Sequence, residues 1–506
     1  MDAALTDPQA VGAYPVRERH GSFIGGAPGD AAGGFEIPVI DPATEAVVSV
    51  LREDDAVDVD RAVAAARDAF DNGPWPRMEI GERKAVLRKA LAHVAAHAEE
   101  LAWLECIETG VPLWDIRGRK IARVVETFEF FMEVAGGMAG ETFQQNSKYL
   151  TYVTHEPVGV VAGLAPWNSP MSLGAMQVAP AIAFGNTCVL KPSEHTPMAL
   201  YRLVQLLNEG GLPPGVVNLV NGRGPVTGEA LVAHKGVDLV KFVGGTETGR
   251  HIMAAAAKGL KKVGLELGGK SANLVFADAD PDEALDGALL GIFSNNGQQC
   301  LAGSRILVQR QIADDFIARF VERARNIRVG DPLDPKTEMG PLAFRQHYER
   351  VLSYVDVARA DGAKLLVGGT RAPGFDKGYY VSPTAVLAPD NDARVCREEI
   401  FGPFATFLVF DTAEDAIRIA NQSSFGLVAY LWSTDIRKVM QVSQAVRAGT
   451  VWVNTPLTRE LRAPFGGYKE SGLGRDSAKD SIEFFTEKKT TTIPVGKLAI
   501  RKMGAD

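Results

Sequence analysis

Cysteine is scarce in this sequence, which has only four among its 506 residues: Cys106, Cys188, Cys300 and Cys396. So few cysteines exclude a disulfide framework and suit a reducing compartment, in which one thiol can be kept free for chemistry. No apolar run approaches the roughly 20 residues that a membrane-spanning helix needs. The first residues also lack the basic and then apolar order of a secretory signal. We therefore expect a cytoplasmic protein with no membrane partner.

A basic tract is missing as well, and the net charge at pH 7 is −8. Nucleic acid is therefore not an expected partner. A metal site is not expected either. His93 and His97 lie one helical turn apart, but no carboxylate stands between them in an HExxH pattern and no third ligand is evident. The length exceeds what one hydrophobic core supports, so we expect two or three domains.

What the sequence does contain, from residue 158 onward, is a series of apolar strands. We expect strands at 158–164, 187–190, 216–220 and 239–243, each followed by turn residues and a helical stretch. This order predicts an α/β fold with a doubly wound parallel sheet. Because ligands of such sheets lie beyond the carboxyl ends of the strands, the four turns should share one site.

The turns after these strands carry residues that suit a dinucleotide. Lys191 and Glu194 fit the adenosine ribose, and a carboxylate there would repel a 2′-phosphate, which favours NAD over NADP. Gly244 and Gly245 open a helix, whose N–H groups favour a pyrophosphate. This is not a GxGxxG motif, and a purely structural glycine turn is about as plausible. We also assign Gly224, in the turn after the third strand, to cofactor binding.

The stretch Asn295–Arg305 is the most informative part of the sequence, because it places one thiol, Cys300, on a polar, glycine-containing bend between a helix and a strand. Such a bend presents a nucleophile, with backbone N–H groups facing the reacting atom. The alternative is a buried cysteine that acts as a small hydrophobe. Upstream, Glu266 lies between apolar neighbours, so it either has an ion-pair partner or has a raised pKa suited to base catalysis.

The remaining pattern gives coarser expectations. Residues 1–35 are at most an ordered arm, Asp58 caps a helix, and residues 82–108 form one long helix that ends at Gly110. Strands at 148–156 and 490–493, far apart in sequence, should pair. They form either an arm that reaches a neighbouring subunit or an ordinary edge hairpin.

Seven stretches, taken in order, carry a family resemblance: 166–168, 191–194, 242–249, 265–270, 297–300, 398–403 and 464–472. Over nearly its whole length the chain resembles the NAD(P)-dependent aldehyde dehydrogenases. The resemblance implies a cofactor domain (1–137 and 158–266), an α/β catalytic domain (267–470) and a β oligomerisation arm (138–157 and 484–499). It also implies a homodimer or homotetramer.

The resemblance also implies roles for individual residues. Cys300 attacks the aldehyde carbonyl, the Asn168 amide and the Cys300 N–H hold the oxyanion, and Glu266 activates water against the thioester. The cofactor is NAD, less favourably NADP. Its implied contacts are Glu399 at the nicotinamide ribose, Phe401 near the nicotinamide, and Pro166 and Trp167 along the channel. For Glu399 the alternative is a surface acid.

Two positions depart from the family pattern. Gln177 stands where many relatives have a lysine that is thought to order the site and relay protons, which puts the deacylation relay in doubt. Gly245 stands where many relatives carry serine, although some semialdehyde-oxidising relatives also have glycine there.

The substrate information lies in one loop, where Arg459 and Arg462 precede the Pro464-Phe465-Gly466-Gly467 turn. Two arginines can bind a carboxylate bidentately. The loop resembles the branch that oxidises hydroxymuconic, carboxymethyl-hydroxymuconic and aminomuconic semialdehydes. In that branch an arginine matching Arg462 contacts the substrate carboxylate, and one matching Arg123 assists.

Three alternatives stay open. The two arginines can instead pair with protein acids such as Glu460. The enzyme can instead be a broad aliphatic or aromatic aldehyde dehydrogenase, or a betaine-aldehyde type. A non-catalytic protein of the same fold is the third alternative, which Gln177 favours and the complete set of Cys300, Glu266 and Asn168 disfavours.

Overall fold

The structure is a computed structural model, and it describes residues 14, 19–30, 34–501, 503 and 504. The predicted arm over residues 1–35 lies largely outside these residues. In its described part, three short strands join larger sheets instead of standing apart: β1 (Arg19–His20), β2 (Phe23–Ile24) and β3 (Ala27–Pro28). β1 pairs with β5 (Val47–Arg52), which also pairs with β4 (Glu36–Ile40).

The first large sheet contains the four predicted strands, whose bounds differ from the prediction by no more than two residues at either end. Its strand order is β22-β12-β11-β8-β9-β10-β2-β3. The five central strands are parallel, whereas β22, β2 and β3 add antiparallel edges. The strands not yet bounded are β8 (Val160–Leu164), β9 (Thr187–Lys191), β10 (Val217–Leu219), β11 (Leu239–Val243), β12 (Lys262–Glu266) and β22 (Gly472–Leu473).

Apolar residues alternate between the two faces of this sheet, so helices cover both sides. Val161 and Leu190 pack on one side, against α2, α3, α5, α6 and α7, and Ala162 and Val189 pack on the other, against α1, α8 and α9. This confirms the predicted doubly wound sheet. The helices are α1 (Ala56–Asp71), α2 (Ile80–Ala96), α3 (Ala98–Thr109), α4 (Leu113–Asp115), α5 (Ile121–Gly136), α6 (Pro170–Ala183), α7 (Met198–Glu209), α8 (Glu229–Ala233) and α9 (Thr246–Ala257).

Two predictions in the helical layer are wrong in detail. The stretch 82–108 is two helices, because the His97 ring Nδ1 donates to the His93 carbonyl oxygen (2.9 Å), while the His97 backbone N–H turns to Val94 (3.0 Å). The N-cap of α1 is Asp55, not Asp58. Asp55 accepts from the Asp58 backbone N–H, and the Asp58 carboxylate accepts from the Asp55 N–H in return.

The second large sheet has the order β15-β16-β17-β14-β13-β19-β20 and is parallel except for β15. Its faces also alternate: Leu307 packs toward α12, α14 and α15, and Ile306 packs toward α10 and α11. The strands are β13 (Ala272–Val275), β14 (Arg305–Gln309), β15 (Lys364–Val367), β16 (Thr384–Leu387), β17 (Phe404–Phe410), β19 (Val428–Trp432) and β20 (Thr450–Val453). The helices are α10 (Pro281–Phe293), α11 (Arg310–Arg325), α12 (Arg345–Ala360), α13 (Arg394–Arg397), α14 (Ala413–Asn421) and α15 (Ile436–Ala445).

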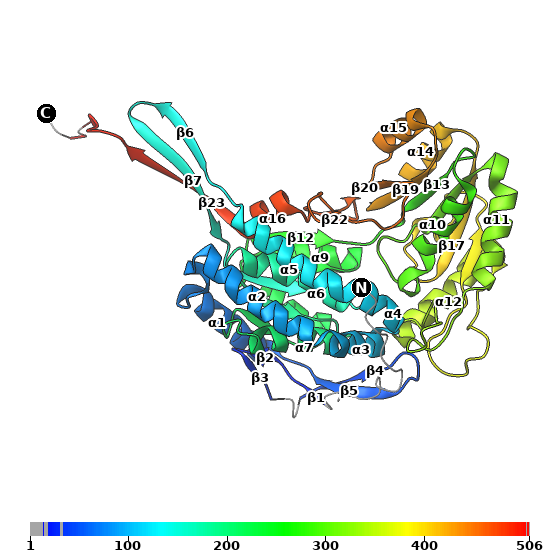
Figure 1. Cartoon of the computed structure of the whole chain (residues 1–506), viewed down its shortest axis with the longest axis horizontal. Helices are drawn as coiled ribbons and strands as arrows, with labels where there is room; N and C mark the ends of the chain where they lie inside the picture. Colours follow the sequence, from blue (N-terminus) through cyan, green and yellow to red (C-terminus); the bar gives the residue numbers. More distant parts are fainter. Residues whose placement is uncertain (1–13, 15–18, 31–33, 502, 505–506) are drawn as a thin grey trace.

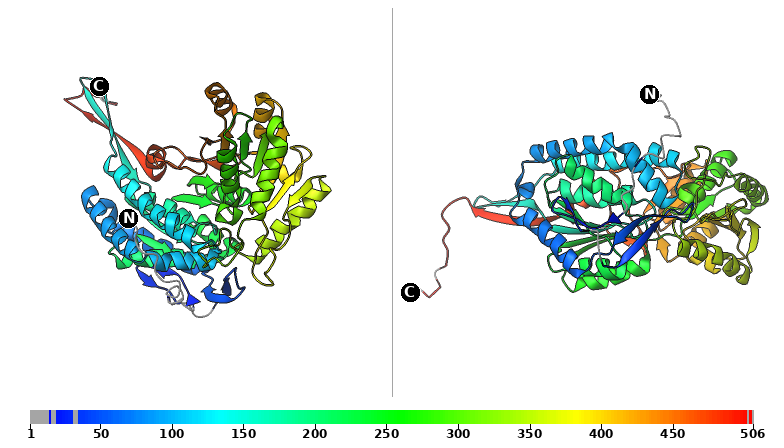
Figure 2. Two further views of the ribbon diagram at one scale, coloured as in Figure 1. Left: turned by 45° about the vertical axis from the view of Figure 1, so that its right-hand side comes forward. Right: turned by 90° about the horizontal axis from the view of Figure 1, so that it is seen from below.

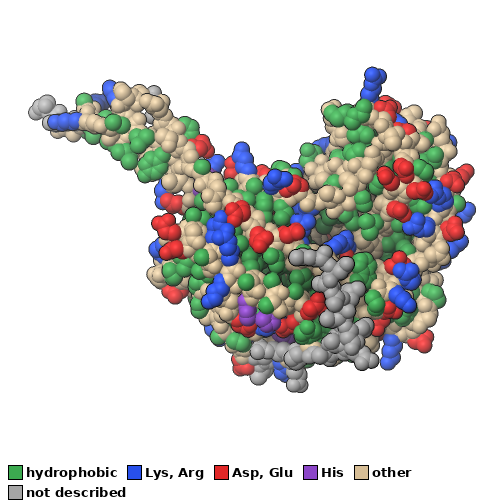
Figure 3. All heavy atoms as spheres, in the orientation of Figure 1, with side chains coloured by type: hydrophobic (Ala, Val, Ile, Leu, Met, Phe, Trp, Pro, Cys, Tyr) green, Lys and Arg blue, Asp and Glu red, His purple; other side chains and the backbone are tan. Residues whose placement is uncertain are grey.

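The third feature is an arm of three antiparallel strands, β6 (Glu141–Asn146), β7 (Tyr149–Pro157) and β23 (Thr486–Pro494), which follows α16 (Ala478–Phe485). The predicted pairing of the two distant segments is confirmed, with Thr490 opposite Val153. The arm projects beyond the body that surrounds the first sheet (Figures 1 and 2). Phe143, Leu150 and Ile493 are exposed on it, and apolar side chains are visible along its surface in Figure 3.

Among the residues that the structure describes, no helix combines the length and apolar character needed to cross a membrane. The same part of the chain holds no cluster of three or more His, Cys, Asp and Glu side chains that could bind a metal ion.

Candidate active site

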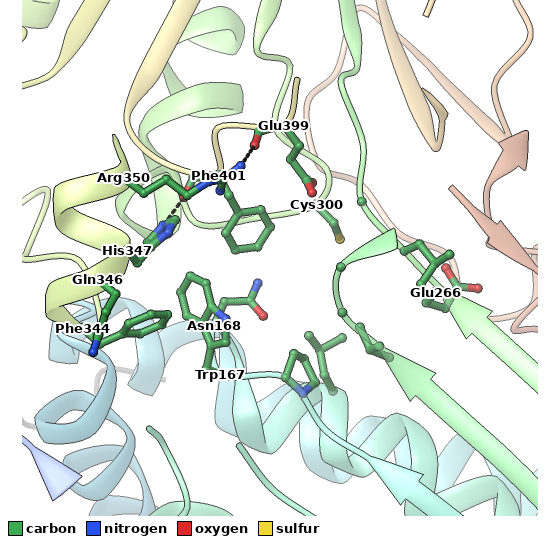
Figure 4. A pocket seen from close by; sticks show the side chains of 17 residues that line it. Trp167, Asn168, Glu266, Cys300, Phe344, Gln346, His347, Arg350, Glu399 and Phe401 are labelled. Carbon is green, nitrogen blue, oxygen red and sulfur yellow. Dashed lines mark hydrogen bonds between the residues drawn. The ribbon is translucent and has the colours of Figure 1, made fainter. Parts of the chain in front are cut away.

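One cavity of about 340 Å³ opens where the carboxyl ends of the first sheet face the second sheet. Its walls come from the turns after β8, β11 and β12, the Cys300 loop, the start of α12 and the segment around Glu399 (Figure 4). Nine of the predicted site residues line it: Pro166, Trp167, Asn168, Gly244, Gly245, Glu266, Cys300, Glu399 and Phe401.

The loop before Cys300 is held in an unusual backbone conformation. Asn295, Asn296 and Gly297 have φ angles of 52°, 56° and 72°, in the left-handed region that asparagine and glycine tolerate best. The Asn296 amide donates to the carbonyl oxygens of Gly110 and Pro341, both at 2.9 Å. Long-range contacts therefore fix the path of the chain that delivers the thiol to the cavity.

Asn168 is tied to the same loop. Its Nδ2 donates to the Gln298 carbonyl oxygen at 2.9 Å, and the Asn295 amide donates to the Asn168 carbonyl oxygen at 3.1 Å. In the view of Figure 4, the Cys300 thiol lies between the Asn168 amide and Glu266. The amide and the thiol line the same cavity, as stabilisation of an oxyanion requires.

Cys300 is half-buried in its loop. Burial raises its pKa to about 12, and the nearby carboxylates of Glu399 and Glu266 raise the pKa further, against the lowering effect of Arg459. The protein alone thus favours the protonated thiol at neutral pH. A positive charge arriving at the site would favour the nucleophilic thiolate.

Glu266 ends β12, and burial raises the pKa of its carboxyl to about 8, with a further upward contribution from Asp476. Its Oε1 is buried and has no hydrogen-bond partner among the described residues. Figure 4 shows the carboxylate turned away from Cys300. A carboxyl with a pKa near 8 suits a general base, because it exchanges protons readily near neutral pH.

The turn predicted to bind a pyrophosphate leads into a helix N-terminus. Gly245 is the N-cap of α9, no side chain caps this end, and a Cβ atom on Gly245 would meet nothing within 4 Å. A Cβ on Gly244 would instead collide with the Phe242 ring. The first N–H groups of α9 therefore face open space in the cavity, where an anion fits.

The predicted ribose contacts lie at the ends of β9 and β10. Lys191 Nζ is 3.8 Å from Glu194, and Glu53 forms a 2.7 Å ion pair with Arg223. These side chains do not line the main cavity, and neither does Gly224, which has open space around its Cα. They adjoin it through His195, whose ring stacks at 3.9 Å on Phe344 of the cavity wall.

The far wall contains residues that the sequence pattern did not identify. His347 hydrogen-bonds the Phe401 carbonyl oxygen (2.7 Å), and Arg350 donates to the Glu399 carbonyl oxygen (2.7 Å). Phe401 has a φ of 63°, which is costly for an aromatic residue, and its ring lies 5.2 Å from that of Trp167. The Glu399 carboxylate accepts from the Gly269 N–H at 2.9 Å, so Glu399 is not a free surface acid.

The arginines of the substrate loop face different ways. Arg462 is 77% exposed and pairs with Glu460 at 2.8 Å, whereas Arg123 pairs with Glu126 at 3.4 Å. Arg459 points inward. Its guanidinium stacks 4.3 Å from the Phe465 ring, and its buried Nε has no partner among the described residues. Cys300 packs against the apolar cluster that includes Phe465.

Comparison with known proteins agrees with this geometry. The Aldehyde dehydrogenase family profile matches residues 30–491. Aldehyde dehydrogenase 1 of Tanacetum cinerariifolium is 43% identical over 474 residues, which are 94% of this chain and 95% of that protein. The chain belongs to the aldehyde dehydrogenase family.

Solved structures give the same assignment. HpcC from Thermus thermophilus superimposes with a TM-score of 0.94 at 41% identity, over 98% of this chain and 97% of that one. The NAD+ complex of an aldehyde dehydrogenase from Bacillus cereus gives a TM-score of 0.92 at 39% identity, over 97% and 99% of the two chains.

This aldehyde dehydrogenase is an oxidoreductase of an NAD(P)-dependent family. Its residues fit a dinucleotide: an uncapped helix end for the pyrophosphate, a buried lysine beside a half-buried carboxylate for a ribose, and an aromatic wall of Trp167 and Phe401 at the thiol end. When bound, the cofactor supplies the hydride acceptor.

Proposed function

We propose that this enzyme oxidises a carboxylate-bearing semialdehyde, of the hydroxymuconic type, to the corresponding acid with NAD. The observation that carries the proposal is Arg459, an inward-facing cation beside the reaction centre. The Arg459 guanidinium has neither a hydrogen bond nor an ion pair to any described residue, and its charge acts on both Cys300 and Glu266. An unpaired polar atom in a buried position is costly, and a substrate carboxylate would give the buried Nε of Arg459 the acceptor that it lacks.

We therefore propose Arg459 as the anchor, rather than Arg462, for which the family resemblance implied that role. Arg462 is occupied by Glu460 at the surface, so it contributes at most a secondary contact. Arg123 lies close enough to Arg459 to lower its pKa, and the two together make the substrate end of the site positive. A planar guanidinium suits a carboxylate because it donates two parallel hydrogen bonds.

The first half of the reaction follows from the Cys300 loop. The thiolate of Cys300 attacks the aldehyde carbon, and the carbonyl oxygen becomes an oxyanion that the Asn168 amide and the Cys300 N–H stabilise. Loss of hydride from this adduct leaves an acyl group on the Cys300 sulfur as a thioester.

The second half requires water. Glu266 takes a proton from a water molecule, the water oxygen forms a bond to the acyl carbon, and the carbon–sulfur bond breaks to return the thiolate. The pKa of about 8 for the Glu266 carboxyl makes the ionised fraction increase as pH rises through that value. Turnover limited by this step should therefore rise from neutral to mildly alkaline pH.

We also propose that NAD is preferred over NADP. The carboxylate of Glu194, held near Lys191, accepts hydrogen bonds from ribose hydroxyls and repels a 2′-phosphate. The Bacillus cereus enzyme of similar structure is known as an NAD+ complex.

The assembly is the remaining part of the proposal. We assign residues 1–137 and 158–266 to cofactor binding, 267–470 to the catalytic domain, and 138–157 with 484–499 to an oligomerisation arm. The exposed apolar side chains of Phe143, Leu150 and Ile493 support an arm that packs on another subunit of a homodimer or homotetramer.

A substrate panel tests the proposed class. Initial rates of NADH formation would be compared for 2-hydroxymuconic semialdehyde, succinic semialdehyde, benzaldehyde and betaine aldehyde. We expect the highest kcat/KM for a carboxylate-bearing semialdehyde and the lowest for betaine aldehyde, whose cation the Arg459 charge repels. If benzaldehyde were the best substrate, a broad aldehyde dehydrogenase would replace the proposal. If no aldehyde reduced NAD, the chain would be a non-catalytic member of the family.

A further inference from the structure

A buried ion pair lies behind Glu266, in a strand that is otherwise apolar. Lys241 Nζ of β11 is 2.6 Å from Asp476 Oδ1, and the two side chains are only 3% and 9% exposed. Taking two charges out of water costs several kcal/mol per ion, which the attraction between them offsets only in part. A Leu or Val at position 241 would pack in this strand without that cost, so the pair needs a reason beyond stability.

The strand register points to that reason. In the parallel pair β11–β12, Lys241 lies opposite Gly264 and Val243 lies opposite Glu266. Residues two apart in a strand share a face, and directly opposed residues point the same way. Lys241 and Glu266 therefore leave the same face of the sheet as diagonal neighbours.

A glycine clears the space that the lysine needs. A Cβ atom on Gly264 would lie 3.1 Å from Cδ of Lys241 and 2.7 Å from Cζ of Phe484. Lys241 thus runs over Gly264, with its Nζ 5.6 Å from the centre of the Phe484 ring. On the other side Lys241 lies opposite Gly163 of β8, where a Cβ would lie 2.8 Å from Oε1 of Gln177, so Gln177 occupies the space over the neighbouring strand.

The partner of Lys241 is built into the loop that encloses Glu266. The backbones of Asp476 and Phe465 exchange two hydrogen bonds, of 2.7 and 2.9 Å, and Gly472 lies opposite Glu266 in the β12–β22 pair. A Cβ atom on Gly466 of the same loop would lie 3.0 Å from Oε1 of Glu266. The ion pair therefore joins the Glu266 loop to the neighbouring strand.

Five charged or titratable groups face Glu266 from the elements around it. Asp476 raises the pKa of the Glu266 carboxyl, whereas Lys241 of β11, Arg459 of the substrate loop and Arg475 lower it, and the Cys300 thiol lies across the cavity. Gln177 is fully buried and uncharged, and it donates to the Leu164 carbonyl oxygen (2.9 Å). Lys241 is thus the cation that balances Asp476 next to the base.

We propose that Lys241 is a positioning residue for deacylation: it holds Asp476 as a neutral pair behind Glu266 and supplies from β11 the positive charge that Gln177 does not provide. The proposal rests on the proposed role of Glu266 as the base that activates water. Without Lys241, the unpaired Asp476 carboxylate would disfavour ionisation of Glu266, and the base would work only at higher pH.

The test separates the two halves of the reaction. Hydride transfer would be followed by stopped-flow absorbance of NADH, and decay of the acyl-enzyme by quench-flow with intact-protein mass, between about pH 6 and pH 10 in wild type and variants. In Lys241→Met we expect hydride transfer within about threefold of wild type. The rising limb of the deacylation profile should move up by about one pH unit, a tenfold loss at neutral pH.

Three further variants sharpen the test. Asp476→Asn should move the limb to lower pH, because it removes a like charge from beside Glu266. In the double variant Lys241→Met/Asp476→Asn the rising limb should return close to its wild-type pH, because an uncharged pair of side chains replaces an ion pair of zero net charge. Lys241→Arg keeps the positive charge, so its pH profile of deacylation should match that of wild type. If Lys241→Met fails to fold, the pH shift of deacylation in Asp476→Asn tests the proposal by itself.

Unchanged deacylation profiles in both single variants would overturn the proposal while leaving the proposed function intact. A wild-type enzyme that forms no acyl-enzyme with any aldehyde would instead contradict the proposed function, and the proposal with it.

Discussion

The loop that carries Cys300 and the loop that carries Arg459 and Arg462 border the same reaction centre, but they are held in different ways. The Cys300 loop is fixed by residues far away in sequence, including Gly110, Asn168 and Pro341. The 458–464 loop is held largely by itself, because the backbone N–H, Nε and Nη2 of Arg462 all donate to Glu460. On the proposed roles of the two loops, the chemistry depends on the whole fold, whereas the specificity depends on a few local contacts.

This contrast predicts that changes in the first loop affect every substrate equally, whereas changes in the second affect only some. The largest expected effect is that of Cys300→Ala. With the nucleophile removed, kcat should fall by roughly 10⁴-fold or more for all aldehydes, measured as NADH formation. Binding of NAD, measured by fluorescence quenching, should be retained. Residual turnover near the wild-type rate would contradict a covalent reaction at Cys300.

The second-largest loss of kcat is expected for Asn168→Ala. Loss of one oxyanion donor typically lowers kcat by about 10²–10³-fold. The Asn168 amide also donates to the Gln298 carbonyl oxygen, and Asn168→Asp removes the donor while it keeps the size of the side chain. Both variants should lose kcat by a similar factor on carboxylate-bearing and neutral aldehydes. A loss restricted to one substrate would mean that Asn168 acts in specificity.

Arg459→Met and Arg462→Met form a matched pair in the second loop. Arg459→Met, which removes the inward guanidinium, should lower kcat/KM for a carboxylate-bearing semialdehyde by about 10–100-fold, the range of a hydrogen-bonded charge contact. Benzaldehyde should be affected far less. Arg462→Met should change kcat/KM for either substrate by less than about threefold, because the loss of a surface ion pair usually has little effect. The reverse order would restore Arg462 as the carboxylate anchor.

The smallest expected effect lies at the cofactor end. Glu194→Ser removes the carboxylate near Lys191, so the kcat/KM ratio of NADP to NAD should rise by roughly tenfold. Ratios measured at fixed, saturating aldehyde give this number directly. An unchanged ratio would mean that Glu194 does not select the cofactor.

The sequence predicted the parallel sheet well, because buried parallel strands form continuous apolar runs and their turns carry polar ligand-binding residues. The family resemblance also implied one site for Cys300, Asn168 and Glu266, and all three line the same cavity. Lys241 was detectable too, as a charge inside an apolar strand, but only the register shows that it lies beside Glu266.

Other features could not be predicted, for physical reasons. His347 and Phe344 reach the cavity from the start of a helix with no local pattern, and only tertiary packing brings them to Phe401 and Trp167. The break at His97 depends on a side chain that competes with the backbone. Arg459 and Arg462 look alike in the sequence, and only the structure shows that Arg459 stacks on Phe465 while Arg462 pairs with Glu460.

The most direct test of the account is to trap the acyl-enzyme in Glu266→Gln. This variant keeps the shape of the side chain but cannot take a proton from water, so hydride transfer should proceed once and hydrolysis should slow by roughly 10²–10⁴-fold. After mixing with NAD and a carboxylate-bearing semialdehyde, the account predicts one equivalent of NADH and a protein mass increased by the acyl group, located by peptide mapping on Cys300. Continued turnover at the wild-type rate, or an acyl group on any residue other than Cys300, would contradict it.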